Sequence, residues 1–142
     1  KDLPTKAIKV LNHGFDNEII KVNKKNLDLL ADSYFFSKDR RKGIDALIQS
    51  LEIESDSKTS YRIARFAFES EDWNMAIKYF DKAKSEKWNE VPGRIDLLKG
   101  IAYYEIDQLN NALKHLELAF EFEESKGAAE GWIQYINQSI GT

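Results

Sequence analysis

Two histidines and three similarly placed aspartates are the residues of this 142-residue chain best suited to chemistry. His13 and His115 are far apart, and neither has a carboxylate or a second histidine at the spacing that metal ligands use. The chain has no cysteine, which excludes disulfides, thiolate catalysis and cysteine-built zinc sites. We therefore expect no metal site.

The three aspartates are Asp39, Asp72 and Asp107, and each precedes a segment with helical periodicity. An aspartate there accepts hydrogen bonds from the free N–H groups of the first helical turn and favours the positive end of the helix dipole. We predict that these residues are helix caps, and we expect Ser57 to cap the segment that it begins. Because no phosphate-binding glycine loop and no nucleophile elbow are present either, we predict a protein that is not an enzyme and needs no cofactor.

Composition and charge narrow the classes of partner. The net charge is -3, from 21 basic and 24 acidic residues, which is too weak to predict binding to nucleic acid. Residues 1–50 carry a net charge of +3 and residues 51–142 a net charge of -6, an asymmetry that either orients a charged partner or is solvated surface. No apolar run approaches the roughly 20 residues of a membrane-spanning helix, so we expect no direct membrane insertion.

A repeated pattern organises the chain: a small residue, a large apolar residue four positions later and a second small residue three positions further on. The four copies are Ala7-Leu11-Gly14, Gly43-Leu47-Ser50, Ala76-Phe80-Ala83 and Ala112-Leu116-Ala119. Their first residues are 36, 33 and 36 positions apart. A period near 34 residues that contains two helices indicates a helical repeat array, and such arrays bind polypeptides on concave surfaces.

Helical periodicity covers most of the sequence and predicts a single all-α domain over residues 1–142. Its parts are the second helix of a truncated repeat, three repeats and a capping helix, with boundaries at 4–15, 24–57, 57–90, 93–124 and 126–140. The 4–15 helix has no first helix before it, so it cannot bury both of its apolar sides. We expect the chain to be part of a longer protein, and we expect the exposed half-repeat to support a homodimer.

These residues resemble tetratricopeptide repeats (TPR), which carry a large residue, Leu, Gly or Ala, and Tyr along the first helix and Ala, Phe and Ala along the second. The first-helix matches are Leu27, Leu30, Ala31 and Tyr34, then Ile63, Ala64 and Ala67, then Gly100 and Tyr103. The resemblance covers about residues 4–124 and implies a right-handed α-solenoid of TPR-type helical hairpins with a C-terminal capping helix. The sequence departs from the family at the inner turns, where Lys38, Glu71 and Asp107 replace the usual glycine.

The resemblance also implies a binding groove formed by the first helices. Carried over to this sequence, the family's groove positions are Lys25, Asp28, Asp32, Phe35, Phe36, Lys58, Tyr61, Arg65, Phe68, Glu69, Arg94, Leu97, Ile101, Tyr104 and Glu105. Phe35, Phe68 and Tyr104 occupy the same position in each repeat, where they either form an aromatic ladder for a partner or pack between neighbouring first helices. We predict a protein or peptide partner and no nucleic acid.

A narrower resemblance rests on two short segments, residues 71–77 and 128–136. Both are similar to bacterial TPR proteins encoded beside a second TonB–ExbB–ExbD system, which implies a periplasmic accessory of TonB-dependent transport. A cytoplasmic location is the alternative. Two other functions also remain open: a structural or oligomerisation array, and the regulatory TPR portion of a larger multidomain protein.

Overall fold

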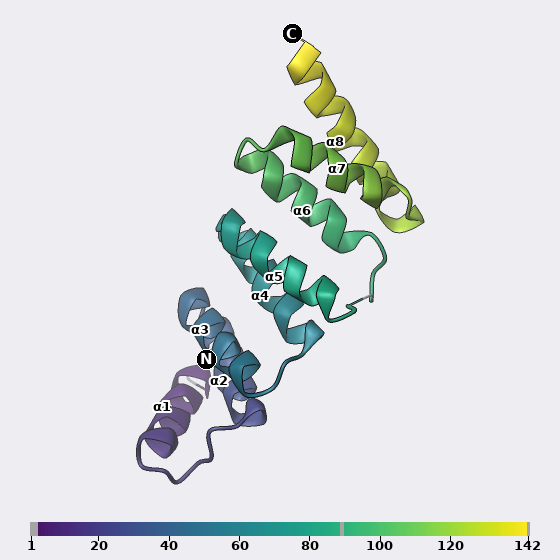
Figure 1. Cartoon of the computed structure of the whole chain (residues 1–142). Helices are drawn as coiled ribbons and strands as arrows, with labels where there is room; N and C mark the ends of the chain where they lie inside the picture. Colours follow the sequence, from purple (N-terminus) through teal and green to yellow (C-terminus); the bar gives the residue numbers. More distant parts are fainter. Residues whose placement is uncertain (1–2, 89, 142) are drawn as a thin grey trace. The chain divides into compact units, whose positions relative to one another are not determined.

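The computed structural model describes residues 3–88 and 90–141, and every regular element in these ranges is an α-helix (Figure 1). The helices are α1 (Leu3–Asp16), α2 (Lys24–Phe36), α3 (Arg40–Ile53), α4 (Ser57–Glu69), α5 (Trp73–Ser85), α6 (Arg94–Glu105), α7 (Leu109–Phe120) and α8 (Glu123–Gly141). They form two compact units that divide within α4, between Thr59 and Ser60. Each unit is described by itself.

The first unit packs α2 against both α1 and α3. Leu27 and Leu47 are almost completely buried between these helices. A Cβ atom on Gly43 would lie 2.5 Å from the ring of Phe35, so a larger residue here would displace that ring at the present separation of α3 and α2. All three residues of the repeated pattern in α3, Gly43, Leu47 and Ser50, are buried, as their spacing predicts.

The second unit contains the α4/α5 and α6/α7 hairpins and α8. The repeated pattern is again buried: Ala76, Phe80, Ala83, Ala112, Leu116 and Ala119 are all 0% exposed. A Cβ atom on Gly100 would lie 2.6 Å from Leu116, which explains the small residue at this point of α6. Leu116 forms a core cluster with Ala112 and Ile136, and Trp132 packs against this cluster, which joins α8 to α7.

Five turns end in a non-glycine residue with left-handed backbone geometry. These residues are Glu18, Lys38, Glu71, Lys87 and Asp107, with φ between 56° and 66°. In each turn the next backbone N–H donates to a carbonyl five residues earlier, for example from Asp39 to Tyr34 at 2.9 Å. This is the Schellman helix end, usually made with glycine. The missing family glycines therefore change the composition of these turns and not their geometry.

Two of the predicted helix caps are confirmed. The carboxylate of Asp39 accepts a hydrogen bond from the backbone N–H of Lys42 at 3.2 Å, and Asp72 accepts one from Met75 at 3.3 Å. Each bond satisfies an amide in the first turn of α3 or α5 that has no partner within the helix.

Two other cap predictions are wrong. Asp107 lies in the left-handed turn that ends α6, and Gln108 is the residue at the N-cap of α7, where it makes no side-chain cap bond. Ser57 is the first residue of α4, and the cap is supplied by Asp56, which accepts from the backbone N–H groups of Lys58 and Thr59, each at 3.3 Å. In both cases the sequence assignment was displaced by one residue.

The last helix begins at Glu123, three residues before the predicted start at 126. Gly127 suggests a helix break in the sequence, but α8 continues through Gly127 and Gly131. Because a Cβ atom at either glycine would have no neighbour within 4 Å, their smallness is not required by packing.

Candidate protein-interaction surface

The predicted groove residues are divided between the two units, and those of the first unit differ in exposure. Lys25, Phe36 and Lys58 are exposed, with 76% of the Phe36 surface open to solvent. Asp28 and Asp32 are half-buried on α2. The first unit therefore presents both charged and aromatic groove residues to solvent.

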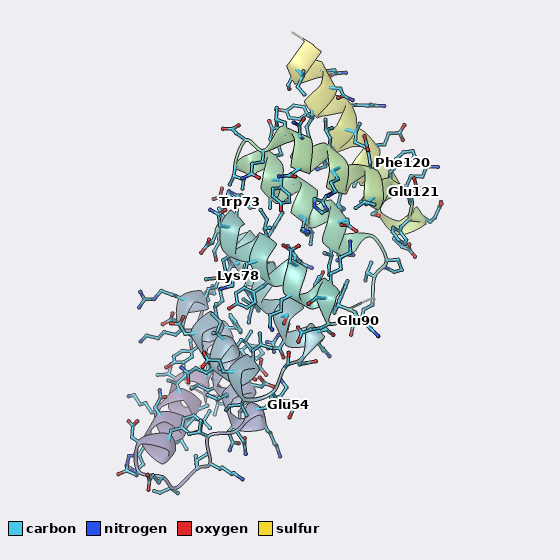
Figure 2. All side chains as sticks on the ribbon, in the orientation of Figure 1. Glu54, Trp73, Lys78, Glu90, Phe120 and Glu121 are labelled. Carbon is cyan, nitrogen blue, oxygen red and sulfur yellow. The ribbon has the colours of Figure 1, made fainter. Side chains whose placement is uncertain are left out.

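Two of the three rings predicted to form a ladder pack inside their own hairpins. Phe35 lies over the backbone of Gly43. Phe68 makes edge-on contacts with Trp73, at a centroid distance of 5.1 Å, and with Phe80, at 6.5 Å. Figure 2 labels Trp73, which begins α5. Truncating Phe35 or Phe68 would therefore disturb packing before it tested a groove.

A hollow of about 710 Å³ lies beside α2 in the first unit. Two exposed aliphatic side chains contribute to it, Leu29 from α2 (52% exposed) and Ile53 from the end of α3 (50% exposed). We call it the α2 hollow, and its lining residues are Asn23, Lys24, Lys25, Asp28, Leu29, Asp32, Ile53 and Glu54. Figure 2 labels Glu54, which follows α3.

A network of polar side chains holds one side of the α2 hollow. The ammonium group of Lys24 lies 3.3 Å from Asp28 and 3.6 Å from Asp56, and it donates a hydrogen bond to the Thr59 hydroxyl at 3.0 Å. Ser50 donates to the other oxygen of Asp28 at 2.7 Å. The predicted groove residue Asp28 is thus fixed by contacts within the unit, and α2, α3 and the first turn of α4 are joined.

Asp56 remains charged in this network. Burial opposes ionisation of its carboxyl group, but hydrogen bonds from Thr59 and Lys58 and the nearby charge of Lys24 outweigh that effect, so the pKa of Asp56 is lowered from 3.8. The cap of α4 is therefore a carboxylate at neutral pH.

In the second unit, the predicted groove residues Tyr61, Arg65 and Glu69 of α4 have partners within the unit. Tyr61 stacks on Trp88 at a centroid distance of 3.9 Å, and its hydroxyl accepts a hydrogen bond from Arg65 at 3.2 Å. Arg65 also lies 3.7 Å from the carboxylate of Glu69. Aromatic and charged groups therefore alternate along one side of α4.

The predicted groove residues of α6 separate into two groups. Leu97 packs against the core cluster between α7 and α8, while Arg94 and Ile101 are half-buried. Tyr104 and Glu105 instead line a hollow of about 670 Å³ together with residues of α8. We call it the aromatic hollow, and its lining residues are Tyr104, Glu105, Gly127, Ala128, Gly131, Trp132 and Tyr135.

Sequence reasoning missed the α8 side of the aromatic hollow because that helix was interpreted only as a cap. Trp132 and Tyr135 are three residues apart, a spacing that places two side chains on the same face of a helix. Their centroids lie 5.4 and 5.8 Å from Tyr104, whose hydroxyl donates to that of Tyr135 at 3.4 Å. The spacing of the two aromatic residues was the available signal.

A polar network surrounds the buried carboxylate of Asp96 in the second unit. Asp96 on α6 accepts hydrogen bonds from Lys84 at 2.9 Å and from Nδ1 of His115 at 3.0 Å. The His115 ring stacks on Tyr103 at a centroid distance of 5.3 Å. Sequence spacing gave no indication of this pair, because the hairpin brings together residues 19 positions apart.

Within residues 3–88 and 90–141, no group of three or more histidine, aspartate or glutamate side chains is placed to hold a metal ion. No helix in these ranges combines the length and the apolar character needed to cross a membrane.

Comparisons with known proteins link this geometry to solved structures. No protein-family model and no curated protein matches the chain. A structure of MamA from AMB-1 is 14% identical, with a TM-score of 0.76 over 97% of this chain and 74% of the MamA chain. One from MSR-1 is 14% identical, with a TM-score of 0.72 over 96% and 84% of the two chains. A third MamA structure is 23% identical, with a TM-score of 0.67 over 89% and 72%.

At these identities the likeness establishes the fold. The chain is an all-α solenoid of TPR-like helical hairpins, as its sequence period predicts. Solved structures of MamA share that arrangement with it.

Proposed function

We propose that this protein is a non-enzymatic interaction module that binds a segment of a protein partner on the faces of its first helices, α2, α4 and α6. The α2 hollow is the observation that carries this proposal. Helical-repeat arrays bind polypeptides on surfaces formed by successive repeats, and the TPR-like fold supports the same use here.

The α2 hollow has the chemistry that a polypeptide segment requires. Leu29 and Ile53 are half exposed, although each is a large aliphatic side chain whose transfer out of water lowers the free energy. Lys25 and Glu54 at the rim bring charges of both signs. An apolar centre with a charged rim is typical of protein interfaces, where the centre supplies affinity and the rim supplies orientation.

Affinity capture from an extract of the source organism tests this function with two matched double variants. Lys25→Glu with Leu29→Ala alters the α2 hollow. Lys114→Glu with Leu118→Ala alters an exposed lysine and leucine with the same spacing on α7, a second helix. We expect the first variant to lose a partner that the second retains. Equal capture by both, at equal melting temperatures, would contradict binding through α2.

The finer assignment is a periplasmic accessory of TonB-dependent transport, and it rests on the two short sequence segments, residues 71–77 and 128–136. We expect the protein in the periplasmic fraction and expect TonB, ExbB or ExbD among the captured proteins. Recovery in the cytoplasmic fraction would contradict this assignment and leave the interaction function standing.

Self-association through α1 is a second proposal, supported by the exposure of two of its aliphatic side chains. Leu3 is 75% and Val10 is 63% exposed. Sedimentation equilibrium of the chain and of the Val10→Asp variant tests a homodimer. A dimer that dissociates in the variant supports the proposal, whereas a monomer in both cases rejects it.

A further inference from the structure

The aromatic hollow between α6 and α8 has a chemical character that the proposed function does not specify. Tyr104, Trp132 and Tyr135 surround it, and Glu105 lies at its rim. Starting from the proposed function, we propose that this hollow receives the cationic side chain of a lysine or arginine from the protein partner.

The arrangement of the three rings favours a cation. Trp132 and Tyr135 meet at 90° with centroids 5.9 Å apart, and Tyr104 and Tyr135 meet at 67°. Rings at such steep angles form walls around a space instead of a flat stack. The face of an aromatic ring carries partial negative charge, so an ammonium or guanidinium group within about 6 Å of the ring is attracted to it, most strongly at tryptophan.

The charges around the hollow are complementary to a basic ligand. Glu105 is exposed, and no basic side chain occurs among the described lining residues. The hydrogen bond with Tyr135, then burial and the negative charges of Tyr135, Glu105 and Asp107, raise the pKa of Tyr104. The carboxylates of Glu105 and Asp107 therefore act on the ring that a bound cation would contact.

One lysine of α8 and one in the middle of α6 have other partners. Lys126, the basic residue of α8, places its ammonium group 5.1 Å from the centroid of Phe120, a residue of α7. Lys99 of α6 is paired with Asp81. Neither lysine lines the hollow, so the cation that we propose for it is the partner's.

The α2 hollow differs in this respect. Its own lining includes Lys24, whose ammonium group is already shared between Asp28 and Asp56. The charge of Asp28 is thus already balanced within the unit, and the exposed lining includes the large aliphatic side chains Leu29 and Ile53. A basic anchor on the partner is thus expected at α8 and an apolar anchor at α2.

Two glycines leave room for the long aliphatic part of a basic side chain. Gly127 and Gly131 line the hollow one helical turn apart, on the same face of α8. A Cβ atom at either position would meet no other atom within 4 Å. The methylene groups of a lysine or arginine can lie against this open backbone while the charged end reaches the rings.

A pair of blocked peptides provides the direct test: Gly-Ser-Lys-Ser-Gly and the same peptide with norleucine in place of lysine. Binding is followed by NMR from the indole N–H of Trp132, with those of Trp73 and Trp88 as internal references. We expect the lysine peptide to shift the Trp132 signal and to bind about fivefold to tenfold more tightly than the norleucine peptide. Equal affinities would overturn the proposal, because an apolar site would then suffice.

Variants at exposed positions locate the effect without disturbing the core. Gly131→Leu fills the hollow and, as an exposed glycine replacement in a helix, is compatible with folding. Tyr135→Leu removes a ring, and Gln134→Leu is its control. Glu105→Gln removes the rim charge, and Glu117→Gln on α7 is its control. We expect the three hollow variants to lose preference for lysine and the two controls to retain it; unchanged preference in Gly131→Leu would reject the site.

The same variants separate this inference from the proposed function. If Gly131→Leu captures the partner normally while Lys25→Glu with Leu29→Ala does not, the interaction function stands and the basic anchor is rejected. If the lysine peptide binds at Trp132 but capture is unaffected by the α2 variant, the cation site stands and the role of α2 falls.

Discussion

At the scale of single residues, Asp96 shows how charge is used inside the second unit. It is 6% exposed and receives hydrogen bonds from Lys84 and His115. A buried carboxylate without such partners would be strongly destabilising. Burial raises the pKa of Asp96, but the hydrogen bonds and charges of His115 and Lys84 outweigh it, so the net direction is downward from 3.8.

The lowered pKa of Asp96 makes the free energy of unfolding depend on pH. A carboxyl group whose pKa is lower in the folded state than in the unfolded state contributes stability above the unfolded value, and that contribution disappears as the pH falls through the folded value. We expect the free energy of unfolding to decrease from about pH 4 downward. Asp96→Asn should cost about 1–3 kcal/mol at neutral pH and flatten that acid-side decrease.

Chemical denaturation at a series of pH values makes the measurement, and Asp45→Asn, at an exposed carboxylate of α3, is the control. The lowered pKa of Asp56 leaves a smaller acid dependence in the Asp96→Asn variant. An acid-side slope in that variant as steep as in the unmodified chain would show that Asp96 is not the group concerned.

Pairings of this kind could not be predicted from the sequence. Asp96 and His115 belong to different helices, and their separation along the sequence does not match the spacing of any metal-binding or catalytic motif. Their contact depends on the register of the α6/α7 hairpin, which the left-handed turn at Asp107 sets. A carboxylate and a histidine in one chain have many alternative partners until that turn is known.

At the scale of elements, the repeated small residues carry the strongest prediction. Ala76 and Ala83 are 0% exposed beside Phe80, so there is no space for a longer side chain. Ala76→Leu should lower the free energy of unfolding by about 1–3 kcal/mol through overpacking. Asn74→Leu, an exposed position on the same helix, should change it by less. Equal effects in thermal denaturation would contradict the close approach of α5 to its neighbour.

The N-caps of two helices lead to one substitution that should lower the free energy of unfolding and one that should raise it. Asp72→Ala removes the cap of α5 and should cost about 1 kcal/mol. Gln108→Asp adds a cap at the start of α7, where no side-chain bond exists, and should stabilise by about 0.5–1 kcal/mol. Denaturation curves that show loss in both variants would mean that the backbone at Gln108 does not accept a capping carboxylate.

Helix boundaries were less predictable than helix positions. Gly127 lowers helix propensity by about 1 kcal/mol relative to alanine, yet α8 begins at Glu123 and continues through it. The burial of Ala129 and Ile136 within the second unit explains this, because packing of an apolar face outweighs local propensity. The aromatic hollow escaped prediction for another reason: the segment that carries Trp132 and Tyr135 was interpreted only as a cap, without a surface of its own.

At the scale of the whole molecule, the fold was predictable because its period appears directly in the residues. The small residues at 43, 76 and 112 begin buried second-helix patterns, and the solved MamA structures share the resulting fold. The candidate site was predicted less completely. Positions of α2 such as Lys25 and Asp28 line a hollow, but Phe35 and Phe68 pack inside hairpins, which helical periodicity alone does not distinguish from exposure.

The central claim is that the partner binds to the first helices of the repeats. Photo-crosslinking with the captured partner tests this claim. A photoreactive amino acid is placed singly at four exposed positions: Lys25 on α2, Glu105 on α6, Lys82 on α5 and Lys114 on α7. Crosslinks from Lys25 and Glu105 and none from Lys82 and Lys114 are the predicted result. Crosslinks from the second-helix positions, with none from the first helices, would contradict the proposed binding surface.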